Sequence, residues 1–452
     1  MPQSRLNTFI IFCLCFLVIW APIPLGSNRP WAWAILEIAI AAIFCLHLVQ
    51  YLRQPFSLSY LRWQLPILLP LLLLQAYLAL QTWQLIPSLD PYQTDVMLQK
   101  GIGFTLWAYL LLTYIRTSDA IEKLLIAVVM SGALQATYGV IIHLLDLPTS
   151  PIIGMVEGDR ARGSFVYQNH FANYLGLCLA LGLGLLLSQL SSRTQKATIK
   201  QLLKDAATNL LSAKFMIRLA LIVMVIGLVL SRSRMGNAAF FVALIAVSLY
   251  AIWFYKRPPT LLKPLVISIL ILDMLVIGSM FGLEKLKQRY AETSFTSEAR
   301  DEVVRDSMPL LEQHWLTGSG GGSFYGIFPA HQPAPYSGFY DHAHNDYLQF
   351  AIELGIPMSL LLACWILFFL WRAARIMASA EHKIDRGCCF GSAMVIIYML
   401  LHMAVDFPLQ SPANTLLFLL ALMLIAICDQ RTKLGKNLSG EIRHQRDEPQ
   451  GY

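Results

Sequence analysis

Charge is scarce in this sequence. Asp, Glu, Lys and Arg make up only 13% of its 452 residues, whereas 56% are hydrophobic. A soluble domain usually carries about 25% charged residues, so this composition excludes an ordinary cytosolic enzyme. The length would fit about three soluble domains, but a mean hydropathy of +0.57 fits one membrane-embedded body with about a dozen spans.

Metal and redox motifs are missing from the cysteines. All eight lie inside or at the edge of apolar runs, and their spacing matches no zinc or redox signature. We expect them to be small buried hydrophobic residues; they are Cys13, Cys15, Cys45, Cys178, Cys364, Cys388, Cys389 and Cys428. The first apolar run has the length of a signal peptide, but the similar runs after it favour a retained signal anchor.

The apolar runs predict twelve transmembrane helices, because a helix needs about 20 apolar residues to cross a bilayer. These helices are expected near residues 8–25, 31–49, 65–82, 99–115, 120–145, 168–190, 215–231, 235–254, 262–283, 345–371, 387–406 and 413–428. The fold class is therefore an all-α polytopic membrane protein. Its expected parts are nine helices with short loops in 1–283, one long and partly helical periplasmic loop in 284–344, three helices in 345–428, and a polar, disordered cytoplasmic tail in 429–452.

The net charge of +7 is explained by topology. With both chain ends in the cytoplasm, 23 of the 34 Lys and Arg residues fall on cytoplasmic segments, as the positive-inside rule expects. Five of the remaining eleven lie in the long 284–344 segment, and long segments cross membranes largely regardless of charge. The basic residues are spread over separate loops, which argues against a nucleic-acid partner.

The segment DHAHNDYLQFAIELG joins a polar cluster directly to an expected span near the outer membrane interface. A histidine there can take a proton from a sugar hydroxyl, because its ordinary pKa of about 6.5 lies near working pH. The alternatives are an interfacial histidine that caps a helix, or a metal site, although the spacing matches no zinc signature. The cluster consists of Asp341, His342, His344, Asn345, Asp346 and Glu353.

Arginines on the expected outer side form a second group. Arg232 and Arg234 fall in a very short turn on the side that should be poor in positive charge, so an anion is expected to compensate them. Guanidinium groups match phosphate geometry and suit a diphosphate leaving group, whereas the alternative is snorkelling to lipid phosphates. The group consists of Arg160, Arg162, Arg232, Arg234 and Arg300.

Acidic residues in or beside spans are functional candidates because their burial is costly. Glu353 and Asp406 lie near the outer face and are placed to orient a histidine or an arginine, whereas Glu37 and Asp273 are expected to form structural pairs or a proton relay. The GSGGGSF run at 318–324 has amides that suit a phosphate cradle, but it lacks the ending of a P-loop, so a flexible hinge is preferred.

These residues resemble the O-antigen ligase and polymerase superfamily of bacterial membrane glycosyltransferases. His344-Asn345, nine further residues and Gly355 resemble the loop motif of that family, although Met358 stands where the motif has a small residue. Three more stretches agree with the family over roughly residues 150–415; they are RARGSFVYQNHFANYL, SRSRMGN and HMAVDFPLQSPAN.

The resemblance implies roles for individual residues. His344 is similar to the catalytic base of the family, and Asp406 to a supporting carboxylate, with Glu353 as a further catalytic candidate. Arg162, Arg234 and Arg300 resemble the diphosphate contacts of the family. Arg160 and Arg232 are further candidates for the same role. Other candidate site residues are His342, Asn345, Asn169 and His170.

The resemblance also implies the reaction. We expect a metal-independent, cofactor-free inverting transferase in the bacterial inner membrane, with its active site facing the periplasm. Its donor would be a glycan on undecaprenyl diphosphate, and its acceptor another glycan, lipid A core or a protein. Ligase and polymerase share these motifs. The alternatives are a multi-pass transporter or flippase of a lipid-linked glycan and a scaffold for envelope assembly.

Overall fold

The computed structural model is α-helical, and it describes residues 5–53, 55, 58–156, 158–189, 213–255, 264, 267, 271, 294–332 and 340–447. Within these residues, nine α-helices are long and apolar enough to cross a membrane. They are α2 (Pro30–Arg53), α3 (Leu58–Thr82), α4 (Pro91–Tyr114), α5 (Ser118–Leu144), α6 (Gln168–Ser188), α9 (Arg234–Phe254), α14 (Asp346–Ser379), α15 (Lys383–His402) and α16 (Pro412–Asp447).

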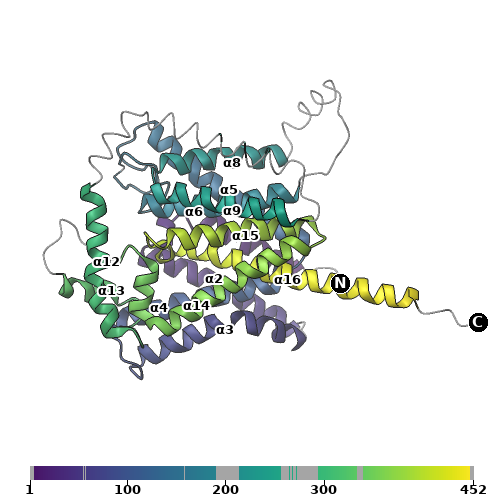
Figure 1. Cartoon of the computed structure of the whole chain (residues 1–452), viewed down its shortest axis with the longest axis horizontal. Helices are drawn as coiled ribbons and strands as arrows, with labels where there is room; N and C mark the ends of the chain where they lie inside the picture. Colours follow the sequence, from purple (N-terminus) through teal and green to yellow (C-terminus); the bar gives the residue numbers. More distant parts are fainter. Residues whose placement is uncertain are drawn as a thin grey trace, which may run out of the picture.

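Two shorter apolar helices, α1 (Arg5–Trp20) and α8 (Ala213–Leu230), coincide with two more of the expected spans. The remaining expected span, 262–283, falls almost entirely outside the described residues, and so does Asp273. The other elements are α12 (Ser294–His314), α13 (Phe324–Ile327), η1 (Leu25–Ser27), η2 (Phe328–His331) and η3 (Pro408–Gln410). Figure 1 shows the long helices running side by side, with α12 standing across one end of the bundle.

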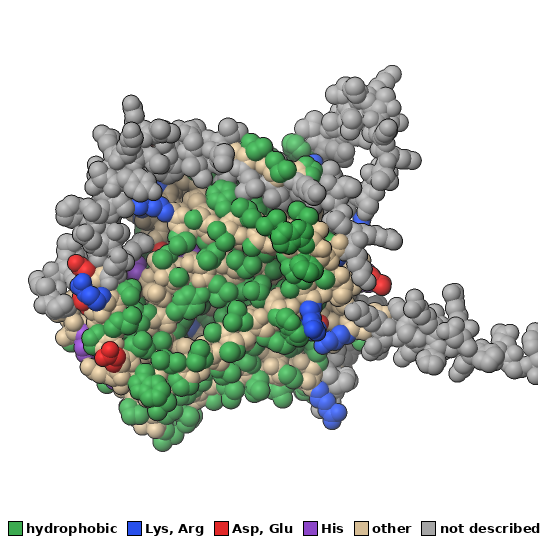
Figure 2. All heavy atoms as spheres, in the orientation of Figure 1, with side chains coloured by type: hydrophobic (Ala, Val, Ile, Leu, Met, Phe, Trp, Pro, Cys, Tyr) green, Lys and Arg blue, Asp and Glu red, His purple; other side chains and the backbone are tan. Residues whose placement is uncertain are grey.

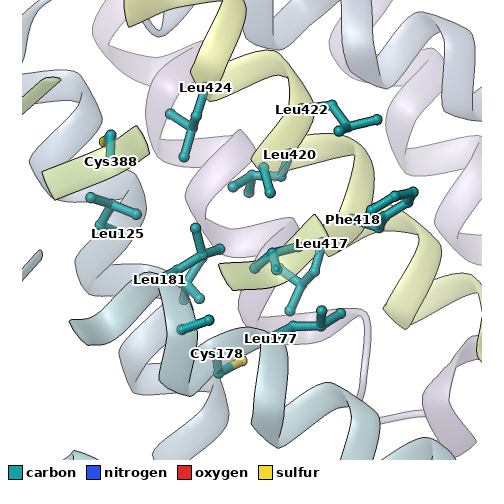
Figure 3. Packing of buried hydrophobic residues seen from close by; sticks show 14 of the residues in the cluster. Leu125, Leu177, Cys178, Leu181, Cys388, Leu417, Phe418, Leu420, Leu422 and Leu424 are labelled. Carbon is teal, nitrogen blue, oxygen red and sulfur yellow. The ribbon is translucent and has the colours of Figure 1, made fainter. Parts of the chain in front are cut away.

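Helix α6 lies at the centre of the bundle. In its most apolar stretch 94% of the residues are buried, compared with 28% in α2, which lies on the outside. Helix α15 packs closely on α6 because both have glycines at the contact: a Cβ atom added to Gly184 would lie 2.3 Å from the carbonyl oxygen of Gly387. Side chains of α5, α6, α15 and α16 fill the core between them (Figure 3).

The outer surface of the bundle is apolar. Figure 2 shows a broad field of hydrophobic side chains over the middle of the visible face, with charged side chains towards its two ends. Large hydrophobic residues such as Phe12, Ile38 and Trp253 are more than half exposed. A surface of this kind fits lipid and not water, so the protein is a polytopic membrane protein.

The cysteines only partly follow the expectation from sequence. Cys178, Cys388, Cys389 and Cys428 are buried among core residues, as expected. The prediction is wrong for two others, because Cys45 and Cys364 are exposed. They lie on α2 and α14, which face outward, and an apolar environment there is supplied by lipid instead of by the protein core.

Helix α14 is interrupted where the sequence predicted one continuous span. Gly355 has φ of +79° and ψ of 158°, which is not helical, and Pro357 follows it. Proline has no N–H to donate and its ring crowds the preceding turn, so the helix breaks here. The segment before the break, 346–354, packs against α12, α13 and η2 through a small second core that includes Val303, Phe324 and Ile352. The expected loop 284–344 is thus partly helical.

The end of α16 corrects a second expectation. The tail from Asp429 was expected to be disordered, but α16 continues through it to Asp447. Ion pairs fix the first turn of this extension: Asp429 pairs with Arg372 of α14 and with Lys433, and Arg431 pairs with Asp385 of α15. The charges of Asp429 and Arg431 thus have partners on neighbouring helices, which stabilise the start of the extension.

Candidate functional site

The polar loop before α14 is fixed onto the turn between α15 and α16. The side chain of Asn345 caps α14 by accepting a hydrogen bond from the Leu348 amide at 3.1 Å. The amide of Asp346 donates to the carbonyl oxygens of Met403 (3.0 Å) and Asp406 (3.2 Å). The Asp346 carboxylate is fully buried and accepts from the Leu409 amide at 3.0 Å. We call the end of the bundle that carries this loop and turn the site end.

His344 lies in this loop in a rare backbone conformation. Its φ is +50°, in the left-handed region that non-glycine residues seldom adopt. Such a conformation is retained only where the surroundings determine it, and it is common at functional sites. The imidazole ring contacts Tyr340 edge-on at a centroid distance of 5.6 Å and Phe407 at 4.8 Å.

Phe407 brings together three histidines, one from α6 and two from the loop before α14. His342 stacks on its ring with centroids 4.4 Å apart, and His170 and His344 each meet it edge-on at 4.8 Å. Phe407 itself is buried. Three of the expected site residues therefore surround one aromatic ring, at the meeting point of α6, the loop before α14 and the α15–α16 turn.

Asp406, the residue before this ring, is tied to α6. One carboxylate oxygen accepts a hydrogen bond from the Asn169 side chain at 2.5 Å, and the other accepts from the Phe407 amide at 2.9 Å. Its side chain is only 3% exposed, so the carboxyl group is held in place beside the histidines. Asn169, a lesser candidate from sequence, is thus the residue that positions Asp406.

A hydrogen-bonded chain leads from His342 to Glu353. The Nδ1 atom of His342 lies 3.3 Å from the side-chain oxygen of Gln349 and 3.2 Å from its nitrogen, and that nitrogen donates to Glu353 at 3.0 Å. Glu353 is 1% exposed and also accepts from the Phe324 amide. The structure therefore places Glu353 behind Gln349, as a support for the loop. Burial lowers the pKa of His342, with Asp341 acting in the opposite direction.

The residues considered for a metal site do not converge. Among the described residues, no three His, Cys, Asp or Glu side chains lie together as metal ligands would. The Asp346 carboxylate faces the Leu409 amide, and the His342 ring lies flat on Phe407. Their positions follow from packing and hydrogen bonding within the protein.

The glycine-rich run 318–324 is neither a phosphate cradle nor a hinge. Its amides donate to protein acceptors: Ser319 to the carbonyl of Ile352 and Gly320 to that of Glu353. A Cβ atom added to Gly318 would lie 2.2 Å from the carbonyl oxygen of Glu353. The glycines are required because this backbone segment packs directly against the break in α14. Its amides replace the hydrogen bonds that the helix loses there.

The arginines gather around two adjoining turns at the site end. The amide of Ala161 donates to the carbonyl of Leu230 at 3.1 Å, which ties the loop before α6 to the turn before α9. Arg232 bridges the same two segments through an ion pair with Asp159 at 2.9 Å. Arg234 begins α9 and is exposed, and the guanidinium of Arg162 donates to the Val156 carbonyl.

Arg160 and Arg162 also line a small pocket together with His143 and Asp146. The loop that carries them is linked to the loop of His342 and His344: the Tyr167 hydroxyl donates to the Asp341 carboxylate at 3.5 Å. Arg300 lies on α12, and its side chain is outside the described part of the structure. The structure therefore gathers Arg160, Arg162, Arg232 and Arg234 at the site end.

Residues 219–363 match the family model of O-antigen ligase. The matched stretch is about a third of the chain and runs from α8 to the middle of α14, so it includes His344, Arg232, Arg234 and Arg300. The resemblance inferred from sequence is thereby confirmed. Enzymes of the O-antigen ligase family are bacterial membrane glycosyltransferases that act on lipid-linked glycans. No curated protein matches the chain.

Several residues of the candidate site were not found from sequence. They include Phe407, Gln349, Tyr167 and the buried pair formed by Asn173 and His402, whose side chains are 2.8 Å apart. One signal was present: Asn169 and Asn173 are four residues apart on α6, and residues at this spacing share a helix face. Which faces meet depends on helix packing, and the sequence pattern does not give it.

Proposed function

We propose that this protein is a glycosyltransferase that moves a glycan from undecaprenyl diphosphate to an acceptor hydroxyl at the periplasmic face of the bacterial inner membrane. The observation that carries the proposal is His344, held in a left-handed conformation within the O-antigen ligase match and in contact with Phe407. In this proposal the chain has twelve spans with both ends in the cytoplasm, and 284–344 is the large periplasmic loop.

His344 acts as the general base. The acceptor hydroxyl gives its proton to the imidazole, and its oxygen attacks the anomeric carbon of the donor sugar. The bond from that carbon to the diphosphate breaks, and undecaprenyl diphosphate leaves with the electron pair, which inverts the configuration. General base catalysis of this kind contributes about 10²- to 10⁴-fold to a rate. Asp406, held by Asn169, stabilises the positive charge that develops on the histidine cluster.

The arginines neutralise the leaving group. Negative charge grows on the diphosphate as the bond breaks, and guanidinium groups stabilise it without a metal ion. We assign this role to Arg162, Arg234 and Arg300. Arg232 is paired with Asp159 and holds the two turns together, and Arg160 lines the same pocket as Arg162.

The acceptor is a hydroxyl of a glycan, of lipid A core or of a protein. A ligase attaches a finished polymer to its acceptor, whereas a polymerase extends the glycan itself. Both reactions need the same base and the same diphosphate contacts, so the site supports the two equally.

A deletion strain tests the proposal. Wild-type protein should restore surface glycan, and His344→Ala should not, although the variant reaches the membrane in equal amount. His382→Ala is the matched control, because His382 is exposed at the opposite end of α15. Restoration by His344→Ala would overturn the proposal. In the strain without the protein, short units attached to core indicate a polymerase, and free polymer indicates a ligase.

A further inference from the structure

The short segment that follows α12 lies against helices that cross the membrane. The carbonyl oxygen of Thr317 accepts hydrogen bonds from two side chains of α3, the Tyr77 hydroxyl at 2.5 Å and the Gln81 amide at 3.0 Å. The carbonyl oxygen of Trp315 accepts from the amide of Ile356, just after the break in α14, at 2.7 Å. This part of the expected periplasmic loop is thereby fixed to two transmembrane helices.

Two arginines mark the membrane boundary opposite the site end. Arg62 lies on α3 and Arg372 on α14. The two helices are in register through the Trp365 side chain of α14, which donates to the Ile67 carbonyl of α3 at 3.0 Å. Along its own helix, each arginine lies about 8–10 Å beyond this hydrogen bond, so the two arginines have nearly the same depth. Long cationic side chains of this kind reach the lipid head groups from the edge of the hydrocarbon core.

The distance from this boundary places residues 315–317 at the level of the lipid chains. At about 1.5 Å per residue, Tyr77 lies about 22 Å from Arg62, and Ile356 lies about 24 Å from Arg372. The hydrocarbon core of a bilayer is about 30 Å thick. Two separate helices therefore indicate that the segment reaches into the leaflet at the site end and does not stand in the water above it.

The side chains of this region suit such a position. Trp315 is 53% exposed and Leu316 is 54% exposed. Trp83 and Leu85, in the turn between α3 and α4, are 71% and 70% exposed. This turn lies at the same end of the bundle as α12 (Figure 1), and the Leu89 amide ties it to the residues after α12 by donating to the Ser319 carbonyl. These exposed side chains extend the lipid-facing surface of α3, of which only 28% is buried.

The backbone here makes the hydrogen bonds that contact with lipid requires. Irregular backbone is tolerated at membrane depth only where protein groups satisfy it, because lipid chains offer no partners. Besides the bonds to the two carbonyl oxygens described above, the amide of Gly318 donates to the His314 carbonyl and that of Ser319 to the Ile352 carbonyl, both at 2.8 Å. The side chains before them can therefore face lipid while these backbone groups stay paired.

We propose that residues 315–317 return into the membrane, and that Trp315 and Leu316, together with the end of α3, anchor the site end in the adjacent lipid leaflet. The partner is the bilayer itself. Leucine meets the lipid chains, and the amphipathic indole ring lies at the boundary between chains and head groups. The anchor holds the break in α14 at the membrane surface. It does not depend on the proposed transfer reaction.

Cysteine labelling of the purified full-length protein in phospholipid vesicles tests the anchor. Leu316→Cys is compared with Arg305→Cys, a matched control on α12 whose side chain is 71% exposed. A charged, membrane-impermeant maleimide should label Leu316→Cys at least about 10-fold more slowly, because a thiol among lipid chains neither ionises nor meets the reagent. Peptide mass spectrometry follows the introduced cysteine alone. Equal labelling rates of the two variants would overturn the proposal.

A second measurement does not use the cysteine variants, whose folding could differ. Phospholipids with brominated chains quench the fluorescence of tryptophans that touch them. Trp315→Phe should lower the quenched fraction, whereas Trp107→Phe should not, because Trp107 is fully buried. An unchanged fraction in Trp315→Phe would contradict the anchor.

The labelling is also repeated over a wide range of protein-to-lipid ratios. Protection of Leu316→Cys by lipid stays constant as the protein is diluted in the membrane. Protection that disappears on dilution would mean that a second copy of the chain covers the residue, and this would overturn the proposal.

Discussion

The two ends of the α6–α15–α16 core hold polar groups in different ways. At the end opposite the site, Arg431 meets Asp385 at 2.8 Å and also donates to the carbonyl of Arg116 and the hydroxyl of Ser118. At the site end, the rings of His170, His342 and His344 surround Phe407, and the Asp406 carboxylate accepts hydrogen bonds from the Asn169 side chain and the Phe407 amide. The first end ties helices together through a charged network, and the second gathers the imidazole and carboxyl groups to which we assign the proton transfer.

The largest effect on stability is expected from breaking the Asp385–Arg431 ion pair at the end opposite the site. Asp385→Ala leaves the Arg431 guanidinium without its carboxylate in a largely buried position, and loss of one partner of a buried pair costs about 3–5 kcal/mol. We expect a clear fall in thermal stability in detergent, with donor binding by the folded fraction unchanged. Asp119→Ala removes an exposed pair and is the control. Equal stability of the two variants would remove the distinction between the ends.

At the site end, the arginines should differ from one another. Arg234→Ala should raise the KM for the lipid-linked donor about 10- to 100-fold, because each charged hydrogen bond lost costs about 1.5–3 kcal/mol. Arg232→Ala should have a smaller effect, because Arg232 is paired with Asp159 at the surface. Steady-state kinetics of the two purified variants measure this difference. A larger effect from Arg232→Ala would reverse the assignment.

The packing of the glycine-rich run 318–324 against α14 can be tested with a matched pair of glycines. Gly318 and Gly154 have nearly the same φ, +71° and +70°, but of the two only Gly318 is crowded by neighbouring atoms. Gly318→Ala should cost about 1–3 kcal/mol more than Gly154→Ala, because a Cβ atom would collide with the Glu353 carbonyl. Comparison of thermal unfolding of the two variants separates packing from backbone strain. Similar losses of stability would show that the glycine-rich run is not tightly packed against α14.

The smallest expected effect is on pH dependence. Burial lowers the pKa of His342 in the folded protein below its ordinary value of 6.5, so the unfolded chain binds more protons below that pH. The contribution of this residue to stability is complete above pH 6.5 and is lost as the pH falls through the folded pKa. His342→Gln should make the stability curve flatter in acid. An unchanged slope below pH 6.5 would contradict this.

Hydropathy predicted the positions of eleven helices because the length of an apolar run directly reflects the thickness of a membrane. It did not predict the break at Gly355, because hydropathy does not register the helix-breaking effect of Pro357 or the packing of residues 315–320, which supply hydrogen-bond partners at the break. The helical continuation past Asp429 depends likewise on charges from α14 and α15.

The candidate site shows the same limit. Local motifs identified His342, His344, Asn169, His170 and Asp406 from three separate stretches of sequence. That one phenylalanine, Phe407, brings the three histidines together could not be read from any of those stretches, because it depends on how α6 meets the α15–α16 turn. The role of Gln349 between His342 and Glu353 is hidden for a similar reason, since hydrogen-bond partners follow from side-chain direction.

The central claim is that His344 takes the proton of the acceptor hydroxyl. Its most direct test measures release of undecaprenyl diphosphate and donor binding in the same samples of purified wild type and His344→Ala. We predict that the variant binds the donor as wild type does and releases undecaprenyl diphosphate at least about 100-fold more slowly. Release at a rate close to that of wild type would contradict the account.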